Sequence, residues 1–163
     1  MKPQSYAART RYRPPAPWYR RLNRLGVLLT SIGLAPRDAV TLQVRGRTSG
    51  RPRRIPILRT RYLGDDYLVA LAGEAQWVRN VRAARGQAAI RRGRTRQVHL
   101  EELPAAERAE IILQYLWALR GRSSATSAAD QARFYFGLGV EATLGDVATI
   151  AAFYPVFRIT YRT

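Results

Sequence analysis

Residues 39–63 read AVTLQVRGRTSGRPRRIPILRTRYL, and this stretch decides the fold. Apolar residues alternate with polar ones in 39–45 and again in 53–63, which is the two-residue period of a β-strand. Gly46 and Gly50 lie between the two runs and allow the backbone to turn. Two strands joined by a tight turn pair antiparallel, so the stretch predicts a β-hairpin. Pro56 has no N–H to donate and therefore predicts an edge position or a bulge in the second strand.

Turn and cap residues divide the rest of the chain into further strands and helices. We expect strands at 66–73, 87–92, 95–103 and 155–162. We expect helices at 18–33, 74–85, 104–121, 129–137 and 143–152, with a loop at 122–130. Strands joined by tight turns, with helices around them, predict an α+β domain built on a small barrel. Residues 1–16 are basic, carry no acid and predict a flexible arm, which leaves 17–163 as a single domain.

The charge of the chain points to an anionic partner. Its 163 residues fit one domain, and they include 28 basic residues against 11 acidic ones, a net charge of +17. Almost all the basic residues are arginines, whose planar fork suits phosphate and carboxylate groups. Codon usage in a GC-rich genome would explain arginine in place of lysine but not the excess of basic residues. The anion could be nucleic acid, membrane headgroups or a polyanionic small molecule.

The residue counts exclude several kinds of site. The chain has no cysteine, so it has no disulfide and no thiol nucleophile, which fits a reducing compartment. His99 is the single histidine, which excludes a multi-histidine metal site, and its place between two apolar strand residues favours a structural role. No apolar run reaches the roughly 18 residues of a spanning helix, and the N-terminus does not resemble a signal peptide. We therefore expect a cytoplasmic protein without a metal.

The hairpin loop is the first candidate for chemistry. Five of the fourteen residues in 44–57 are arginines, and the two glycines free backbone N–H groups to converge on one point. Thr48 and Ser49 add hydroxyl donors, so the loop could hold a phosphate or carboxylate. It is not a Walker loop, because no glycine–lysine pair opens a helix after it. The alternative is a solvated basic turn.

A second candidate is the stretch AQWVRNVRAAR at 75–85, which follows a predicted strand. A strand-to-helix junction presents free N–H groups and the positive end of the helix dipole. Trp77 and Val81 lie one turn apart and would pack inward, which leaves Arg79, Asn80 and Arg82 available for binding. The alternative is that Trp77 is only a core residue.

Several short motifs, taken in order, resemble one family. They are Gly46-Arg47-x-Ser49-Gly50, the Arg53/Arg54 pair with Pro56-Ile57, Gly64-Asp65-x-Tyr67-Leu68-Val69, and Trp77-x-x-Asn80-x-x-Ala83, all after Leu42. In this order and spacing the chain resembles the deazaflavin-dependent nitroreductase family over roughly residues 40–103.

The resemblance implies a split β-barrel related to flavin-mononucleotide-binding oxidoreductases. It implies an oxidoreductase that binds coenzyme F-420, an 8-hydroxy-5-deazaflavin with a phosphate and an oligoglutamate tail, and transfers a hydride to quinones, nitroaromatics or other electrophiles. The anion facing the arginines would then be that tail. By similarity, the cofactor-binding residues are Arg47, Thr48, Ser49, Arg53, Arg54, Ile55, Pro56, Ile57, Leu58, Ala72, Gly73, Trp77, Val78, Arg79 and Asn80.

The chain departs from the family's pattern in two places. Only three residues separate Gly73 from Trp77, and Glu74 stands where the family often has serine or lysine. The C-terminal region also lacks the tyrosine-rich end that covers the substrate in the best-known members. Tyr115, Tyr135 and Tyr154 are candidate substitutes, as proton donors or substrate walls, although tyrosine is often half-buried for packing alone.

Other functions remain open at the level of sequence. Flavin mononucleotide or a heme could occupy the same barrel. A nucleic-acid-binding module fits the charge, but helix-turn-helix, zinc and aromatic-strand signatures are absent from the sequence, so nucleic acid is not expected. The predicted helix 18–33 could lie on anionic lipid through its basic face, or its apolar face could close the end of the barrel.

Overall fold

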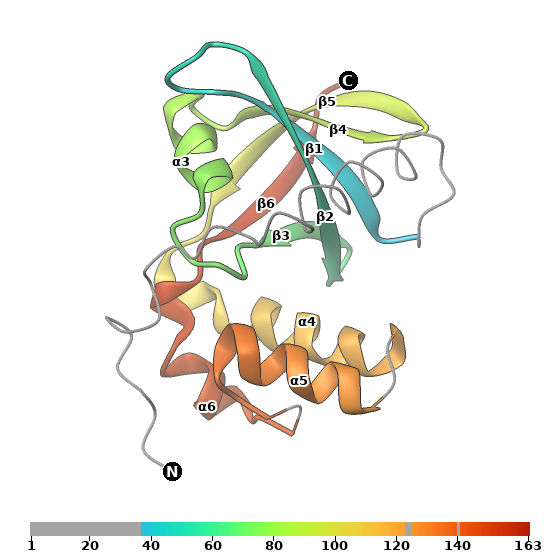
Figure 1. Cartoon of the computed structure of the whole chain (residues 1–163), viewed down its shortest axis with the longest axis vertical. Helices are drawn as coiled ribbons and strands as arrows, with labels where there is room; N and C mark the ends of the chain where they lie inside the picture. The colour runs from blue at the N-terminus through green and yellow to red at the C-terminus, as the bar shows by residue number, and fades with distance from the viewer. Residues whose placement is uncertain (1–36, 123–124, 140) are drawn as a thin grey trace.

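The computed structural model describes residues 37–122, 125–139 and 141–163. Six antiparallel strands form a closed barrel in the order β1-β2-β3-β6-β5-β4, and most of the helices lie together on one side of it (Figure 1). The strands are β1 Ala39–Arg45, β2 Pro52–Tyr62, β3 Asp65–Val69, β4 Gln87–Arg92, β5 Arg94–Glu102 and β6 Val156–Tyr161. The helices are α3 Gln76–Ala83, α4 Ala109–Arg122, α5 Ala125–Phe136 and α6 Leu144–Ala148, with short 3-10 turns η1 Ala105–Glu107 and η2 Ala151–Phe153. This confirms the predicted split β-barrel with peripheral helices.

The predicted hairpin is present and begins the barrel. β1 and β2 pair from Ala39 opposite Leu58 to Arg45 opposite Pro52. β1 also pairs with β4 on its other side, where Leu42 lies opposite Ile90. β6 completes the ring, since it pairs with both β3 and β5. The barrel is therefore closed by strands from the two ends of the described chain.

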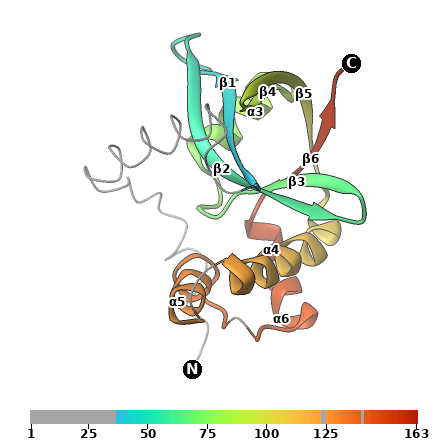
Figure 2. The same ribbon diagram turned by 90° about the vertical axis from the view of Figure 1, so that its right-hand side faces the viewer.

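Alternation along the strands produces two separate cores. In β3, Leu68 points into the barrel and belongs to one apolar cluster, with Val40, Leu42 and Phe157. Tyr67, its neighbour, points outward and belongs to a second cluster with the buried faces of α4, α5 and α6. The helical layer thus covers the outside of β3 and β6, and the view in Figure 2 shows α4 and α5 beneath the barrel.

Several predicted boundaries were wrong. The third strand ends at Val69 instead of continuing to 73, because Gly73 adopts a φ of +67° and donates its N–H to Ala70 in a turn. α4 continues through Gly121, since the buried apolar face of the helix outweighs a glycine penalty of about 1 kcal/mol. α5 occupies most of the predicted loop at 122–130, because Ala132 and Phe136 of this helix are buried in the helical cluster.

The short β3 leaves part of β2 open on one side. β3 pairs only with Arg59–Tyr62 of β2, so among the described residues 52–58 pair with β1 alone. Pro56 lies in this part, opposite Thr41 of β1, where a missing N–H on the open side costs no ladder bond. The edge position predicted for Pro56 is therefore confirmed.

Two predictions fall on residues that the structure does not describe: the arm at 1–16 and the helix at 18–33. They remain predictions, and so does membrane contact through 18–33. In the part of the chain that the structure does describe, none of the helices has the length and apolar character needed to cross a membrane.

A buried carboxylate closes the barrel at the end with the β2–β3 turn. Asp66 is 6% exposed and lies on the same strand face as Leu68. Its side chain accepts hydrogen bonds from Arg59 Nη1 at 3.2 Å, Arg61 Nε at 3.1 Å and the Tyr161 hydroxyl at 2.9 Å. Burial also raises the pKa of Tyr161, which keeps its hydroxyl protonated as a donor. The cluster ties β2, β3 and β6 together.

A second charged cluster fixes α3 to the barrel. Arg82 of α3 makes a bidentate pair with Glu102 of β5, with both N–O distances 2.8 Å, and also bonds Glu74. Arg108 donates to the same Glu102 at 3.2 Å and to the backbone oxygen of Leu103 at 2.9 Å. α3 is thereby held to β5 and to the start of the helical layer.

Replacing the buried carboxylate should destabilise the barrel. We expect Asp66→Ala to lower the free energy of unfolding by about 3 kcal/mol, because it leaves the guanidinium of Arg59 unpaired at a partly buried site. The control is Asp65→Ala, since Asp65 is 57% exposed and its ion pair with Arg158 is long, at 3.7 Å. Urea unfolding would measure both. Equal losses in the two variants would contradict the structural role of Asp66.

The cluster around Glu102 should make a pH-dependent contribution to the free energy of unfolding. Hydrogen bonds from Arg82 lower the pKa of Glu102, so its stabilisation is complete above the unfolded pKa of about 4.3 and is lost as pH falls through the folded pKa. We expect Glu102→Gln to cost about 1 kcal/mol at pH 7 and progressively less below pH 4. Chemical unfolding across pH 3–7 would check this, with Glu101→Gln as control because that side chain is 61% exposed. A cost that does not change with pH would contradict it.

Candidate functional site

The hairpin loop between β1 and β2 is closed by its own backbone. Gly46 donates its N–H to Arg51 O at 2.9 Å, and Gly50 donates to Gly46 O at 2.8 Å. A Cβ on Gly46 would lie 3.0 Å from Ser49 Oγ and 3.1 Å from Arg51 O, and Gly50 has a φ of +66°. Both glycines are therefore required by the turn itself. The loop is compact and presents its arginine and hydroxyl side chains outward.

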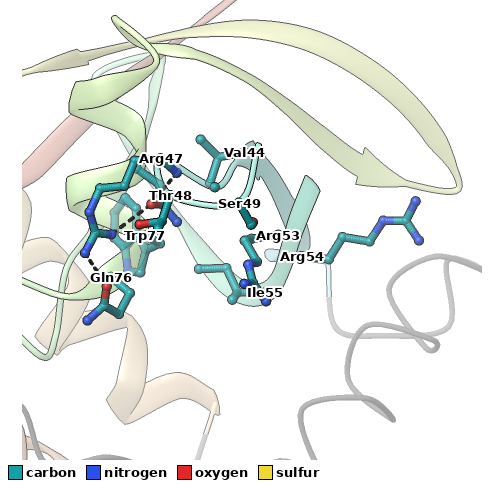
Figure 3. A pocket seen from close by; sticks show the side chains of 11 residues that line it. Val44, Arg47, Thr48, Ser49, Arg53, Arg54, Ile55, Gln76 and Trp77 are labelled. Carbon is teal, nitrogen blue, oxygen red and sulfur yellow. Dashed lines mark hydrogen bonds between the residues drawn. The ribbon is translucent and has the colours of Figure 1, made fainter. Parts of the chain in front are cut away.

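The loop is fixed to α3 by one arginine. Arg47 donates its backbone N–H to Asn80 Oδ1 at 3.2 Å and its Nη1 to the same oxygen at 2.9 Å. Its Nη2 donates to Gln76 Oε1 at 2.8 Å (Figure 3). Asn80 is 6% exposed, whereas Gln76 and Arg47 are exposed. These bonds join residues 29 and 33 positions apart in sequence and set the position of the loop relative to the helix.

A pocket of about 470 Å³ lies between the loop and α3 (Figure 3). Its lining residues are Val44, Gly46, Arg47, Thr48, Ser49, Arg53, Arg54, Ile55, Gln76, Trp77 and Asn80. The volume is within the usual range for small-molecule sites. The lining includes three arginines, two hydroxyls and two amides, and it includes no carboxylate. The pocket is therefore suited to an anion.

One wall of the pocket is apolar. Val44 and Ile55 point inward from β1 and β2, and both belong to or pack against the barrel core. The ring of Trp77 packs on Phe157 with 5.4 Å between centroids and a tilt of 55°. Trp77 thus packs against the core and also forms part of the pocket wall. An apolar wall beside cationic groups suits a ligand with a flat ring and a charged chain.

Neighbouring arginines of β2 point in opposite directions. Arg53 lies opposite Val44 on the strand face that turns into the pocket, and Arg54 lies on the other face. Arg54 donates its Nε to Gln43 Oε1 at 3.1 Å, and Figure 3 shows its side chain extending away from the other labelled residues. Arg53 is therefore better placed than Arg54 to meet a ligand, although both residues line the pocket.

The structure brings together about half of the predicted cofactor-binding residues. Those that line the pocket are Arg47, Thr48, Ser49, Arg53, Arg54, Ile55, Trp77 and Asn80. Those outside its lining are Pro56, Ile57, Leu58, Ala72, Gly73, Val78 and Arg79. Strand and helix geometry explain much of this separation: Leu58 packs against the helical layer, and Val78 is fully buried in the barrel core.

Sequence reasoning missed three lining residues: Val44, Gly46 and Gln76. Gln76 could have been found, since it lies four residues before Asn80 and so on the same face of the helix. Val44 could have been found from strand alternation, because it shares the inward face with Leu42. Gly46 was recognised as a turn residue, but a lining role for its backbone depends on the loop conformation.

The three candidate tyrosines lie away from the pocket. Tyr115 of α4 and Tyr154 are 2% and 5% exposed, and both rings pack on Phe136 in the helical cluster. The Tyr154 hydroxyl donates to the backbone oxygen of Tyr135, whose own side chain packs against the same cluster. The structure therefore gives all three tyrosines packing contacts, and none of them lines the pocket.

Glu74, which departs from the family's pattern, does not line the pocket. Its carboxylate is paired with Arg82, so the negative charge next to α3 is balanced. In the described parts of the chain, no group of three histidine, cysteine, aspartate or glutamate side chains could hold a metal ion. The pocket is cationic, and its positive charge comes from arginine side chains.

Comparisons with known proteins show the family and the fold of the chain. The chain matches a family model described as F420H(2)-dependent quinone reductase over residues 12–133. No curated protein sequence matches it. A solved structure described as a domain-swapped dimer is 19% identical with a TM-score of 0.50, covering 90% of this chain and 100% of that one. An F420-H2 dependent reductase is 20% identical with a TM-score of 0.47, covering 76% and 95% of the two chains.

A third structure, a protein of unknown function from Agrobacterium tumefaciens, is 13% identical with a TM-score of 0.51 and covers 93% of this chain and 60% of its own. Identities this low show the fold alone, whereas the family model matches most of the sequence. The chain therefore belongs to the F420H(2)-dependent quinone reductase family and is an oxidoreductase that uses coenzyme F-420 on a split β-barrel.

Proposed function

We propose that the pocket between the hairpin loop and α3 binds the anionic part of coenzyme F-420, and that the chain reduces a quinone, a nitroaromatic or another electrophilic small molecule. The proposed binding of the cofactor's anionic part rests on the charge of the pocket, because its charged lining groups are all arginines. The proposed reduction of an electrophilic small molecule rests on the family to which the chain belongs.

The arginines and hydroxyls of the loop fit a phosphate or carboxylate. Arg53 projects from β2 on the pocket face, and Arg47 is held at the other side by α3. Thr48 and Ser49 are exposed at the loop and add O–H donors. Each charge-assisted hydrogen bond to an anion contributes about 1.5–3 kcal/mol, so a few of them are enough to hold a multiply charged tail.

The apolar wall fits an aromatic ring. Trp77, Ile55 and Val44 offer a surface without charged groups next to the cationic part of the pocket. An aromatic side chain such as Trp77 can stack on a flat ring system and exclude water from one face of it. The same residues would orient the ring relative to the anion held by the loop.

The hydride chemistry is supplied by the reduced deazaflavin when it is bound, and the protein contributes position and electrostatics. The pocket accordingly contains no cysteine or histidine. Its arginines also favour the build-up of negative charge on a bound acceptor, which assists transfer of a hydride to an electrophile. Flavin mononucleotide is the second candidate ligand, because its phosphate would meet the same donors.

A binding titration tests the ligand. We expect coenzyme F-420 to quench tryptophan fluorescence saturably, since Trp77 lines the pocket, and flavin mononucleotide to bind more weakly. The Trp77→Phe variant should lose much of the quenching while still binding the cofactor in equilibrium dialysis. Reduction of menadione and of a nitroaromatic by the reduced cofactor would then test the substrate class. Preference for flavin mononucleotide, or no binding of either, would contradict the proposal.

The arginine variants test the place of the anion. We expect Arg53→Gln to weaken F-420 binding at least tenfold, because it removes a charge that faces the pocket. Arg94→Gln makes the same change in charge at an exposed position in the β4–β5 turn, and we expect less than a twofold effect at 0.15 M salt. Equal weakening in both variants would mean that only net charge matters and would contradict a specific site.

A further inference from the structure

Arg82 of α3 and Arg47 of the hairpin loop, which bonds to α3, are held in different ways. Arg82 bonds the carboxylates of Glu74 and Glu102, so its positive charge is neutralised. Arg47 bonds Asn80 and Gln76, whose side-chain amides carry no charge. A guanidinium can only donate hydrogen bonds, so both amides must turn an oxygen toward it. Arg47 is therefore fixed in position while its charge remains uncompensated.

The geometry of α3 accounts for this arrangement. Gln76 is the first residue of the helix and Asn80 follows four residues later, so the two side chains lie on one face, one turn apart. That face also includes Trp77 beside them at the pocket, whereas Val78 and Val81 face the barrel core. Asn80 in addition accepts the backbone N–H of Arg47, which fixes the loop as well as the side chain.

We propose that Asn80 and Gln76 are positioning residues that hold Arg47 by neutral amides, so that its full charge is presented to the anion of the bound cofactor. This inference rests on the proposed function of the pocket. A carboxylate at either position would make equally good hydrogen bonds to Arg47 but would cancel its charge. An amide keeps the geometry and leaves the charge free for a phosphate or carboxylate ligand.

The same hydrogen bonds also restrict the side-chain conformations of Arg47. Arginine side chains lose considerable rotamer freedom when they are fixed, and that loss opposes binding if it occurs on association. Here the hydrogen bonds that restrict the side chain of Arg47 come from α3 of the protein itself. Asn80 and Gln76 would therefore lower the entropic cost of engaging the anion through Arg47.

The test uses amide-to-acid variants and two forms of the cofactor. Asn80→Asp and Gln76→Glu keep the shape and the acceptor, and Gln76 is exposed, so its variant should fold. Each is titrated with coenzyme F-420 and with the deazaflavin that carries only the ribityl chain, without phosphate or glutamates. We expect both variants to bind F-420 about tenfold more weakly and the phosphate-free compound within twofold of wild type, with an unchanged or higher thermal midpoint.

Two further variants separate geometry from charge. Asn80→Ala removes the acceptor and should weaken F-420 binding without strengthening the fold. Ala83→Glu adds the same negative charge at an exposed position at the end of α3 and should change F-420 affinity less than twofold. Wild-type affinity in Asn80→Asp together with weak binding in Asn80→Ala would mean that geometry alone matters and would overturn the inference.

Two other outcomes are informative. Equal weakening for both cofactor forms in the acid variants would place the effect away from the anion and would also overturn the inference. If the wild-type protein does not bind F-420 at all, the proposed function of the pocket is wrong. That outcome differs from one in which the wild-type protein binds F-420 and only the role given to Asn80 and Gln76 is wrong.

Discussion

Closure of the barrel through β1 is the constraint on which the rest of the structure depends. β1 pairs with β2 along its whole length and with β4 on its other side. The β1–β2 loop is consequently anchored at both ends to a closed sheet, and α3 is fixed beside it by packing in the barrel core and by the pair between Arg82 and Glu102. A pocket between these two elements can be rigid, because neither element is a free loop.

The acidic residues of the barrel are paired with particular arginines. Asp66 is paired with Arg59 and Arg61 at one end of the barrel, and Glu102 is paired with Arg82 and Arg108 beside α3. Among the residues that the structure describes, no acidic side chain lines the pocket. Arginines are thus paired with carboxylates in these two structural clusters, whereas the arginines of the pocket, where a ligand is proposed to bind, have no carboxylate beside them in the lining. Net charge alone could not have distinguished these uses of arginine.

The sequence predicted most of the barrel and eight of the eleven residues that line the candidate site, for physical reasons. Strand alternation and the paired glycines of the hairpin are local, and they located β1 and β2 within a residue or so. The predicted helix at 129–137 corresponds to α5, but residues 125–128 were assigned to a loop, because apolar positions in α5 are few and the helix depends on packing of Ala132 and Phe136 against the helical layer. Tertiary packing of this kind overrides a local pattern of small and polar residues.

The division of the predicted site residues between the pocket and the rest of the barrel follows from strand geometry. Motifs select a continuous stretch such as 53–58, but a strand exposes its residues alternately, so the stretch divides between the pocket, the core and the helical layer. The bond between Arg47 and Asn80 could not be read from the sequence, since it joins residues 33 positions apart. The sequence motifs nevertheless include both Arg47 and Asn80.

Hydrogen–deuterium exchange of the full chain with and without oxidised F-420 tests the central claim most directly, because it reports where the cofactor binds without any substitution. The account predicts that protection on binding concentrates in the amides of residues 46–55 and 76–80, and that α4 and α5 change little. Protection located mainly in α4 and α5, with the hairpin loop unchanged at saturating cofactor, would contradict it.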